Sequence, residues 1–277
     1  MIRALALAAA LVSGTAQAQE RVVSIGGSVT EIVHALGQGD RLIARDTTST
    51  YPEGVTALPD VGYLRALSPE GVLSTAPDLV LAEEGAGPPE ALEVLENASV
   101  PVVIVPNEPS PAGVLAKIRA IGAALATEAE AEALAIAIGE RLDQVQARIA
   151  GLPPEGRKRV LFILSTQGGR ILASGSGTSA DAMIALAGGV NAVTGFSGYK
   201  PLTDEAVIEA APDAILMMAR GGDHIADQAE LLALPAISVT PAAETGSVIR
   251  MDGLYLLGFG PRTADAVADL AAALYGE

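Results

Sequence analysis

The chain has 277 residues, contains no cysteine and carries a formal net charge of −16. The lack of cysteine excludes disulfides, thiolate metal sites and cysteine catalysis. A charge this negative, without any long run of Lys or Arg, argues against nucleic acid or an anionic lipid surface as a partner.

The first 18 residues have the pattern of a secretory signal peptide. Arg3 supplies the positive charge, residues 4–12 form a short apolar core, and Ala16-Gln17-Ala18 is a small-x-small cleavage motif. The alternative is a buried first helix, since the run is too short for a permanent membrane anchor. We expect export to the periplasm and no lipid anchor, because no cysteine is present to carry a lipid.

Strands and helices alternate through the first half of the chain. A β-branched strand at 21–25 precedes Gly26-Gly27, and we expect Ser28 to cap the next helix, with Glu31 completing a capping box. Further strands are expected at 41–45, 79–82 and 102–105, with a helix at 90–97. This alternation is typical of a parallel sheet covered by helices on both faces.

Residues 111–149 are rich in strong helix formers. Thr127, with Glu130 at the capping-box position, predicts the start of one long helix that ends at Ile149. A helix of roughly 20 residues is about 30 Å long. The alternation then resumes, with a strand at 159–165, a helix at 179–186, a strand at 214–218 and an amphipathic helix at 263–275.

One segment of the chain occurs twice. Residues 67–81 return as residues 202–216, each reading as a turn, a short helix, an Ala-Pro-Asp turn and a buried strand. A Gly-Tyr pair precedes each copy, at Gly62-Tyr63 and Gly198-Tyr199. A repeat at this separation implies two lobes of similar construction, and a cleft between two lobes is a usual place for a small molecule to bind.

These patterns predict an α/β fold of two Rossmann-like lobes, each a mainly parallel sheet flanked by helices, joined by one long backbone helix. The expected boundaries are a signal peptide at 1–18, an N-terminal lobe at 19–126, the linking helix at 127–150 and a C-terminal lobe at 151–277.

Three segments carry a family resemblance: DVGYLRALSPE at 60–70, GYKPL at 198–202 and MDGLYLLGFGPR at 251–262. Through them the chain resembles the periplasmic haem-binding proteins of bacterial haem-uptake ABC transporters, in the helix-linked class III of substrate-binding proteins. The resemblance covers essentially the whole chain after the leader. The Ala-Pro-Asp repeats indicate only the broad class, whereas the Gly-Tyr-Leu-Arg and LLGFGPR segments narrow it to haem.

The resemblance implies that ferric haem b binds in the cleft as the transported ligand, without a catalytic cofactor, and that Tyr63 ligates the iron. Ferric iron favours phenolate, and a nearby guanidinium stabilises that charge. Arg220 is the expected guanidinium, since it follows the strand at 214–219, at the edge where ligands of open α/β sheets bind. The alternative for Tyr63 is a turn tyrosine packed on the lobe surface.

Other contacts stay open at this point. Arg65 either meets a haem propionate or lies on the surface, and Tyr199 is either structural or touches the haem edge. Some relatives add a histidine ligand near 165–169, where this chain has none, so five-coordinate iron is preferred and His224 is only a possible second ligand. His34 is expected to be structural. Met217 and Met218 either line the porphyrin face or pack in the core.

Members of this class dock on an inner-membrane ABC permease, which works with an ATPase subunit, through one glutamate from each lobe. By position, Glu90 and Glu205 match, with Glu83, Glu84 and Glu93 as alternatives to Glu90. A glutamate in the first turn of a helix is also ordinary, because it complements the helix dipole. We expect a monomer.

Rival functions find less support. The chain has no Gly-x-Ser-x-Gly elbow, His-Glu-x-x-His helix or Walker loop, which argues against an enzyme. A receptor for bare metal ions would need several histidines, and only two are present. A cobalamin or ferric-siderophore receptor would have the same fold, although an aromatic content of 3% without tryptophan argues modestly against a stacked corrin pocket.

Overall fold

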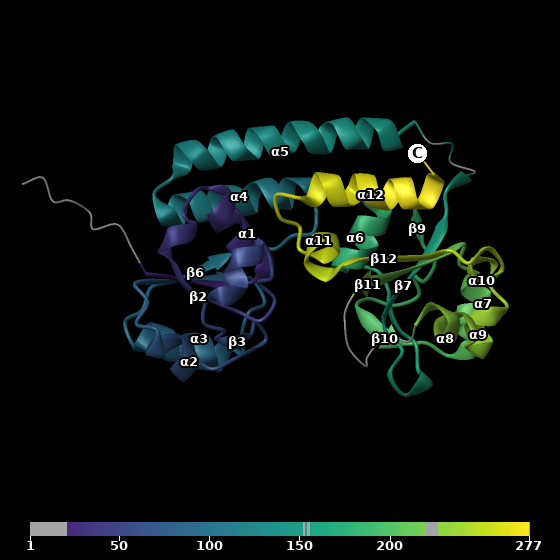
Figure 1. Cartoon of the computed structure of the whole chain (residues 1–277), viewed down its shortest axis with the longest axis horizontal. Coiled ribbons are helices and arrows are strands. Elements are labelled where there is room, and N and C mark those ends of the chain that lie inside the picture. Colours follow the sequence, from purple (N-terminus) through teal and green to yellow (C-terminus); the bar gives the residue numbers. More distant parts are fainter. Residues whose placement is uncertain (1–20, 152, 154–155, 220–226, 277) are drawn as a thin grey trace, which may run out of the picture.

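The computed structural model describes residues 21–151, 153, 156–219 and 227–276. The predicted signal peptide, Arg220 and His224 therefore lie outside the described residues. Two α/β lobes lie side by side, and one long helix runs across both of them (Figure 1). None of the described helices combines the length and the apolar character needed to cross a membrane.

The N-terminal lobe is built on a four-stranded parallel sheet of order β2-β1-β5-β6. Its strands are β1 (Val22–Ile25), β2 (Leu42–Arg45), β5 (Leu79–Glu83) and β6 (Val102–Val105). The helices of this lobe are α1 (Gly27–Ala35), α2 (Pro69–Ser74), α3 (Pro89–Asn97) and α4 (Pro111–Leu125). A small hairpin of β3 (Gly62–Tyr63) and β4 (Ala66–Leu67) stands apart from the sheet.

The C-terminal lobe has a mixed sheet of order β10-β8-β7-β11-β12, with β9 beside β7. Its strands are β7 (Arg159–Ser165), β8 (Leu172–Ser174), β9 (Val190–Asn191), β10 (Tyr199–Pro201), β11 (Ala214–Ala219) and β12 (Val248–Asp252). Only β8 runs antiparallel to its neighbours β7 and β10. The helices are α6 (Ser179–Leu186), α7 (Asp204–Ala210), α8 (Gln228–Leu232), α9 (Pro235–Ser238), α10 (Pro241–Thr245), α11 (Gly253–Leu257) and α12 (Thr263–Tyr275).

The long helix α5 (Glu128–Ile149) has 22 residues, or about 33 Å at the helical rise. Its buried side chains recur every three or four positions and form one apolar stripe, from Ala131 to Ile149. This stripe packs against α4 in one lobe and α12 in the other (Figure 1). One buried apolar cluster therefore joins the two lobes, and Ile118 of α4 and Phe162 of β7 are both members of it. The predicted fold class is confirmed.

The repeated Ala-Pro-Asp turn has the same structural role in both lobes. In each copy the aspartate carboxylate accepts a hydrogen bond from the backbone N–H of an arginine at the start of the lobe's first strand. Arg21, just before β1, donates to Asp78 (3.2 Å), and Arg159, the first residue of β7, donates to Asp213 (2.8 Å). The alanine of each turn has a left-handed backbone, with φ of 49° and 39°. The repeat thus ties the end of a helix to the start of the sheet, which is a scaffold role.

Both predicted capping boxes are wrong. Helix α1 begins at Gly27, before Ser28, and the Ser28 hydroxyl donates to Glu83 Oε2 (2.6 Å) rather than capping the helix. Thr127 is the residue before α5, but its side chain makes no capping bond and instead donates to the carbonyl of Gly122. Partners from other segments replace the local ones in both places.

Candidate functional site

A cleft of about 490 Å³ separates the two lobes. Its walls follow the carboxyl ends of strands in both sheets: Gly27 and Ser28 come after β1, Glu83 ends β5, and Ala219 and Asp252 end β11 and β12. Ligands of open α/β sheets bind at this edge, and the volume lies within the ordinary range of about 300–1,000 Å³ for small-molecule sites. A second hollow, of about 110 Å³, lies between α5 and α12, away from this edge.

The hairpin of the N-terminal lobe places Tyr63 on the cleft wall. Tyr63 is 43% exposed to solvent, while the neighbouring Leu64 is buried and anchors the hairpin turn. Arg65 Nη1 donates a hydrogen bond to the Tyr63 phenol oxygen over 3.2 Å. Both residues line the cleft. A guanidinium thus lies within hydrogen-bond distance of the phenol oxygen on the cleft wall.

Tyr199, the repeat counterpart of Tyr63, has a different environment. Its ring packs edge-on against Phe162, with ring centroids 6.3 Å apart, and it is not among the residues that line the cleft. Burial raises the pKa of Tyr199, while hydrogen bonding to Thr178 and the charge of Arg65 act in the opposite direction. Arg65 therefore exerts its charge on both lobes.

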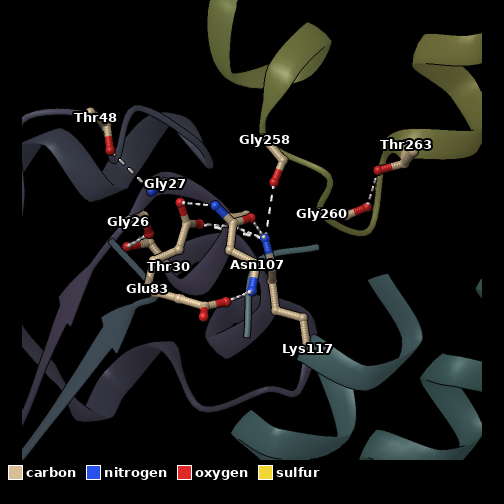
Figure 2. A network of polar contacts seen from close by, with 12 residues as sticks. Gly26, Gly27, Thr30, Thr48, Glu83, Asn107, Lys117, Gly258, Gly260 and Thr263 are labelled. Carbon is tan, nitrogen blue, oxygen red and sulfur yellow. Dashed lines mark hydrogen bonds and ion pairs between the residues drawn. The ribbon is translucent and has the colours of Figure 1, made fainter. Parts of the chain in front are cut away.

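A polar cluster lies at the floor of the cleft, and we name the group Ser28, Glu83, Asn107, Lys117 and the Gly258 carbonyl the floor cluster. Figure 2 labels Glu83, Asn107, Lys117 and Gly258 of this cluster. The Lys117 ammonium donates to Ser28 Oγ (2.8 Å), Asn107 Oδ1 (2.8 Å) and the Gly258 carbonyl (3.2 Å). It also lies 3.5 Å from Glu83 Oε2. The Glu83 carboxylate accepts from Ser28 and from Asn107 Nδ2 (2.9 Å).

Lys117 is fully buried, although lysine is rarely buried unless it is paired. Burial lowers the pKa of Lys117, and the carboxylate of Glu83 opposes that shift. Sequence reasoning missed this residue. The available signal is its position: Lys117 lies on the face of α4 that also carries the buried Val114, Ile118 and Ile121.

The structure brings together some of the predicted site residues and separates others. Tyr63 and Arg65 form a pair in the cleft, and Met218 lines it, whereas Met217 packs in the core of the C-terminal lobe. The prediction of Arg220 as the guanidinium beside Tyr63 concerns a residue outside the described ranges. Arg65 holds that position among the described residues.

His34 and Glu83 also have definite places. His34 lies in α1 and is not among the residues that line the cleft; its Nε2 is buried and has no hydrogen-bond partner within the described part of the chain. The side chain of Glu83 is only 14% exposed and is bonded within the floor cluster, which argues against Glu83 as a docking glutamate.

The exposed glutamates of the lobe ends follow the repeat. Glu205 lies in the first turn of α7, behind the N-cap Thr203, whose hydroxyl accepts from a backbone N–H. Glu70 lies at the equivalent place in α2, behind the N-cap Ser68, which makes the same bond. Glu90 is in the first turn of α3, where Pro88 is the N-cap and provides no such side chain. The structural counterpart of Glu205 is therefore Glu70, which the repeated sequence already aligns with it.

Within residues 21–151, 153, 156–219 and 227–276, no three His, Cys, Asp or Glu side chains gather into a group that could hold a metal ion.

Comparison with known families and structures gives consistent matches. The model of the periplasmic binding protein family matches residues 22–254. A solved structure of the periplasmic heme-binding protein BhuT in complex with two hemes is 42% identical, with a TM-score of 0.87, over 92% of this chain and 97% of that one. The periplasmic heme-binding protein RhuT from Roseiflexus sp. RS-1, in apo form, is 38% identical, with a TM-score of 0.89, over 93% of this chain and 98% of that one.

Curated proteins show a wider range of relatives. The uncharacterized ABC transporter substrate-binding lipoprotein YvrC of Bacillus subtilis (strain 168) is 30% identical over 92% of this chain and 80% of that protein. A vitamin B12-binding protein of Yersinia pseudotuberculosis (serotype O:1b, strain IP 31758) is 37% identical, but only over 36% of this chain and 35% of that protein.

Proposed function

Because the chain belongs to the periplasmic binding protein family, we propose that it is the haem receptor of a bacterial haem-uptake ABC importer. It binds ferric haem b in the cleft between its lobes and delivers it to the permease and ATPase subunits at the inner membrane. The observation that carries the proposal is the pairing of the Tyr63 phenol with Arg65 on the cleft wall. The likeness to solved periplasmic heme-binding proteins over more than nine-tenths of the chain supports it.

The residues of the cleft fit the chemistry of haem iron. The Tyr63 oxygen is a ligand of the kind that ferric haem accepts as phenolate, and the Arg65 guanidinium donates a hydrogen bond to it. Tyr63 is the single iron ligand in this proposal. Arg65 holds the ligand oxygen, Arg220 and His224 are further proposed haem contacts, and Tyr199 either packs structurally or touches the haem edge.

The proposal also covers the class of protein, its oligomeric state, its domain boundaries and its cellular location. The family is one of substrate-binding transport proteins, so we assign no catalytic reaction and no catalytic cofactor. The proposed form is a periplasmic monomer released from a signal peptide at 1–18, with lobes at 19–126 and 151–277 and a linking helix at 127–150. Although YvrC is called a lipoprotein, this sequence contains no cysteine that could carry a lipid.

Cobalamin or a ferric siderophore is the alternative ligand, since the same fold serves for both. The vitamin B12-binding proteins match only about a third of the chain. They therefore support the fold, while the heme-binding structures match over nearly the whole chain and favour haem.

Haemin titration followed by visible absorption tests the proposal. We expect the wild type to bind haemin, and Tyr63→Phe to change the spectrum and lose at least about tenfold in affinity, which corresponds to about 1.4 kcal/mol. Tyr199→Phe is the matched control, because it removes the phenol oxygen of the repeat counterpart and should keep the wild-type spectrum. Cobalamin is titrated in parallel. Binding of cobalamin without haemin, or a Tyr63→Phe spectrum identical to the wild type, contradicts the proposal.

A further inference from the structure

The segment 253–262 of the C-terminal lobe lies against α1 and α4 of the N-terminal lobe, and we name this contact the inter-lobe seam. Figure 1 shows α11 and the loop that leads to α12 between the two lobes. The side chain of Leu254 packs so closely on Gly27 that a Cβ there would lie 2.5 Å from Leu254 Cδ1. The lobes are therefore connected at a second place besides α5.

Arg262 makes the first of two polar contacts across the seam. Its Nε and Nη2 donate to Glu31 Oε1 (3.0 Å) and Oε2 (2.9 Å), in the bidentate geometry that makes arginine–carboxylate pairs strong. Glu31 belongs to α1 and is only 5% exposed. The guanidinium also stacks on the ring of Tyr51, 3.7 Å from its centroid. Two groups of the N-terminal lobe thus hold one side chain of the C-terminal lobe.

Lys117 makes the second polar contact across the seam. Its ammonium belongs to the N-terminal lobe and donates to the Gly258 carbonyl of the C-terminal lobe, as the dashed line in Figure 2 shows. The same ammonium holds Ser28 and Asn107 and lies beside Glu83. A buried charge is costly unless it is fully bonded, so moving the lobes apart at Gly258 removes one of the bonds that keep this ammonium satisfied.

The floor cluster and the cleft share groups. Ser28, Glu83 and Gly258 line the cleft, and Lys117 bonds to all three of them from beneath. We infer that Lys117 is a positioning residue of the cleft, which sets the distance between the two cleft walls by joining the N-terminal floor to the main chain of Gly258. The inter-lobe distance can be measured without haem and does not depend on the proposed function. Only the rate of haemin dissociation rests on the proposed function.

Double spin labelling measures the predicted effect directly. The chain contains no cysteine, so Glu93→Cys in α3 and Glu209→Cys in α7 give one exposed label on each lobe. Pulsed electron resonance then reports the inter-lobe distance distribution without any haem. We expect Lys117→Met to broaden this distribution toward longer distances. Arg119→Met is the matched control: Arg119 lies on the same helix, in an exposed ion pair with Glu132, and its loss should leave the distribution unchanged.

Two further measurements separate positioning from stability alone. Arg262→Gln removes the contact with Glu31 and should broaden the distribution of inter-lobe distances in the same direction. This variant keeps the test decisive if Lys117→Met does not fold. In folded variants, haemin should dissociate about tenfold faster, or about 1.4 kcal/mol. A folded Lys117→Met protein with a lowered melting temperature but a wild-type distance distribution overturns the inference. Failure of every variant and of the wild type to bind haemin refutes the proposed function, and the distance result then still decides the role of Lys117.

Discussion

At the scale of single residues, the hydrogen bond between Arg65 and Tyr63 distinguishes the N-terminal copy of the repeat from the C-terminal copy. The two residues stand two positions apart across a hairpin turn, and this arrangement brings a guanidinium within 3.2 Å of a phenol oxygen. The repeat supplies the comparison. Gly198-Tyr199 is followed by Lys200, and the Tyr199 ring packs edge-on against Phe162 and is not among the residues that line the cleft. The two copies thus differ in the surroundings of their tyrosines.

His34 makes stability depend on pH. Burial lowers the pKa of His34 below its usual value near 6.5, and the charge of Asp40 only partly opposes this. Since the folded state releases the proton more easily than the unfolded state, the contribution of His34 is present above about pH 6.5 and is lost as the pH falls through the lowered pKa. We expect the free energy of unfolding to fall between about pH 7.5 and pH 5.5, and His34→Gln to reduce that slope.

Urea unfolding followed by circular dichroism at several pH values measures this slope for both proteins. Acidic side chains titrate mostly below this range in both, so the difference between the two slopes isolates His34. Identical slopes would show that burial does not shift the histidine.

At the scale of elements, the crossing of α4 and α5 depends on one glycine. A Cβ at Gly122 would lie 2.2 Å from the Cβ of Ala131, which is buried in α5. We expect Gly122→Ala to push the helices apart and to destabilise the protein by about 1–3 kcal/mol, the usual cost of overpacking. Because α5 also carries α12, the effect should reach both lobes.

Gly139→Ala is the matched control within α5. A Cβ at Gly139 would lie 3.5 Å from Leu115 Cδ1, which is ordinary contact. Alanine is the better helix former, so this change should leave stability unaffected or raise it by about 0.5–1 kcal/mol. Urea midpoints measure both variants, and equal destabilisation by the two would argue against a close crossing at Gly122.

At the scale of the whole molecule, each lobe has one exposed glutamate at an equivalent place, which makes the two residues candidates for the proposed docking. Glu205 and Glu70 occupy the same place in α7 and α2, both exposed and both behind a capping hydroxyl. Glu90 lies in the neighbouring helix α3. The proposed pairing of Glu90 with Glu205 therefore has a competitor, and the symmetry of the lobes favours Glu70 as the partner of Glu205.

Haem uptake into vesicles that contain the permease and ATPase subunits distinguishes the two candidates. We expect Glu205→Ala and Glu70→Ala each to lower the uptake rate, by about tenfold when combined (about 1.4 kcal/mol), with haemin affinity unchanged. Glu90→Ala is the comparison variant. Loss of uptake with Glu90→Ala but not with Glu70→Ala would assign the N-terminal contact to α3, and full uptake in all three variants would remove the glutamates from docking.

The sequence by itself determined the elements whose signals are local. The strand at 159–165, the helices at 179–186 and 263–275 and the end of the long helix agree with the structure, because periodicity, caps and breakers act within a few residues. The repeat likewise predicted two lobes and a cleft. The strands β8, β9 and β12 were not predicted, and two of them, β8 and β9, have only three and two residues, too few for a periodic pattern to stand out.

Only the tertiary structure decided how the cleft is built. Lys117 bonds to Ser28 and Gly258, which are 89 and 141 positions away, and Arg262 bonds to Glu31 across 231 positions. No local pattern encodes partners at such distances, because only the tertiary fold brings these segments together. For the same reason Ser28, a good capping residue in its own segment, donates to Glu83 instead. A hydrogen bond to a charged carboxylate is stronger than one between neutral groups, and α1 already begins at Gly27.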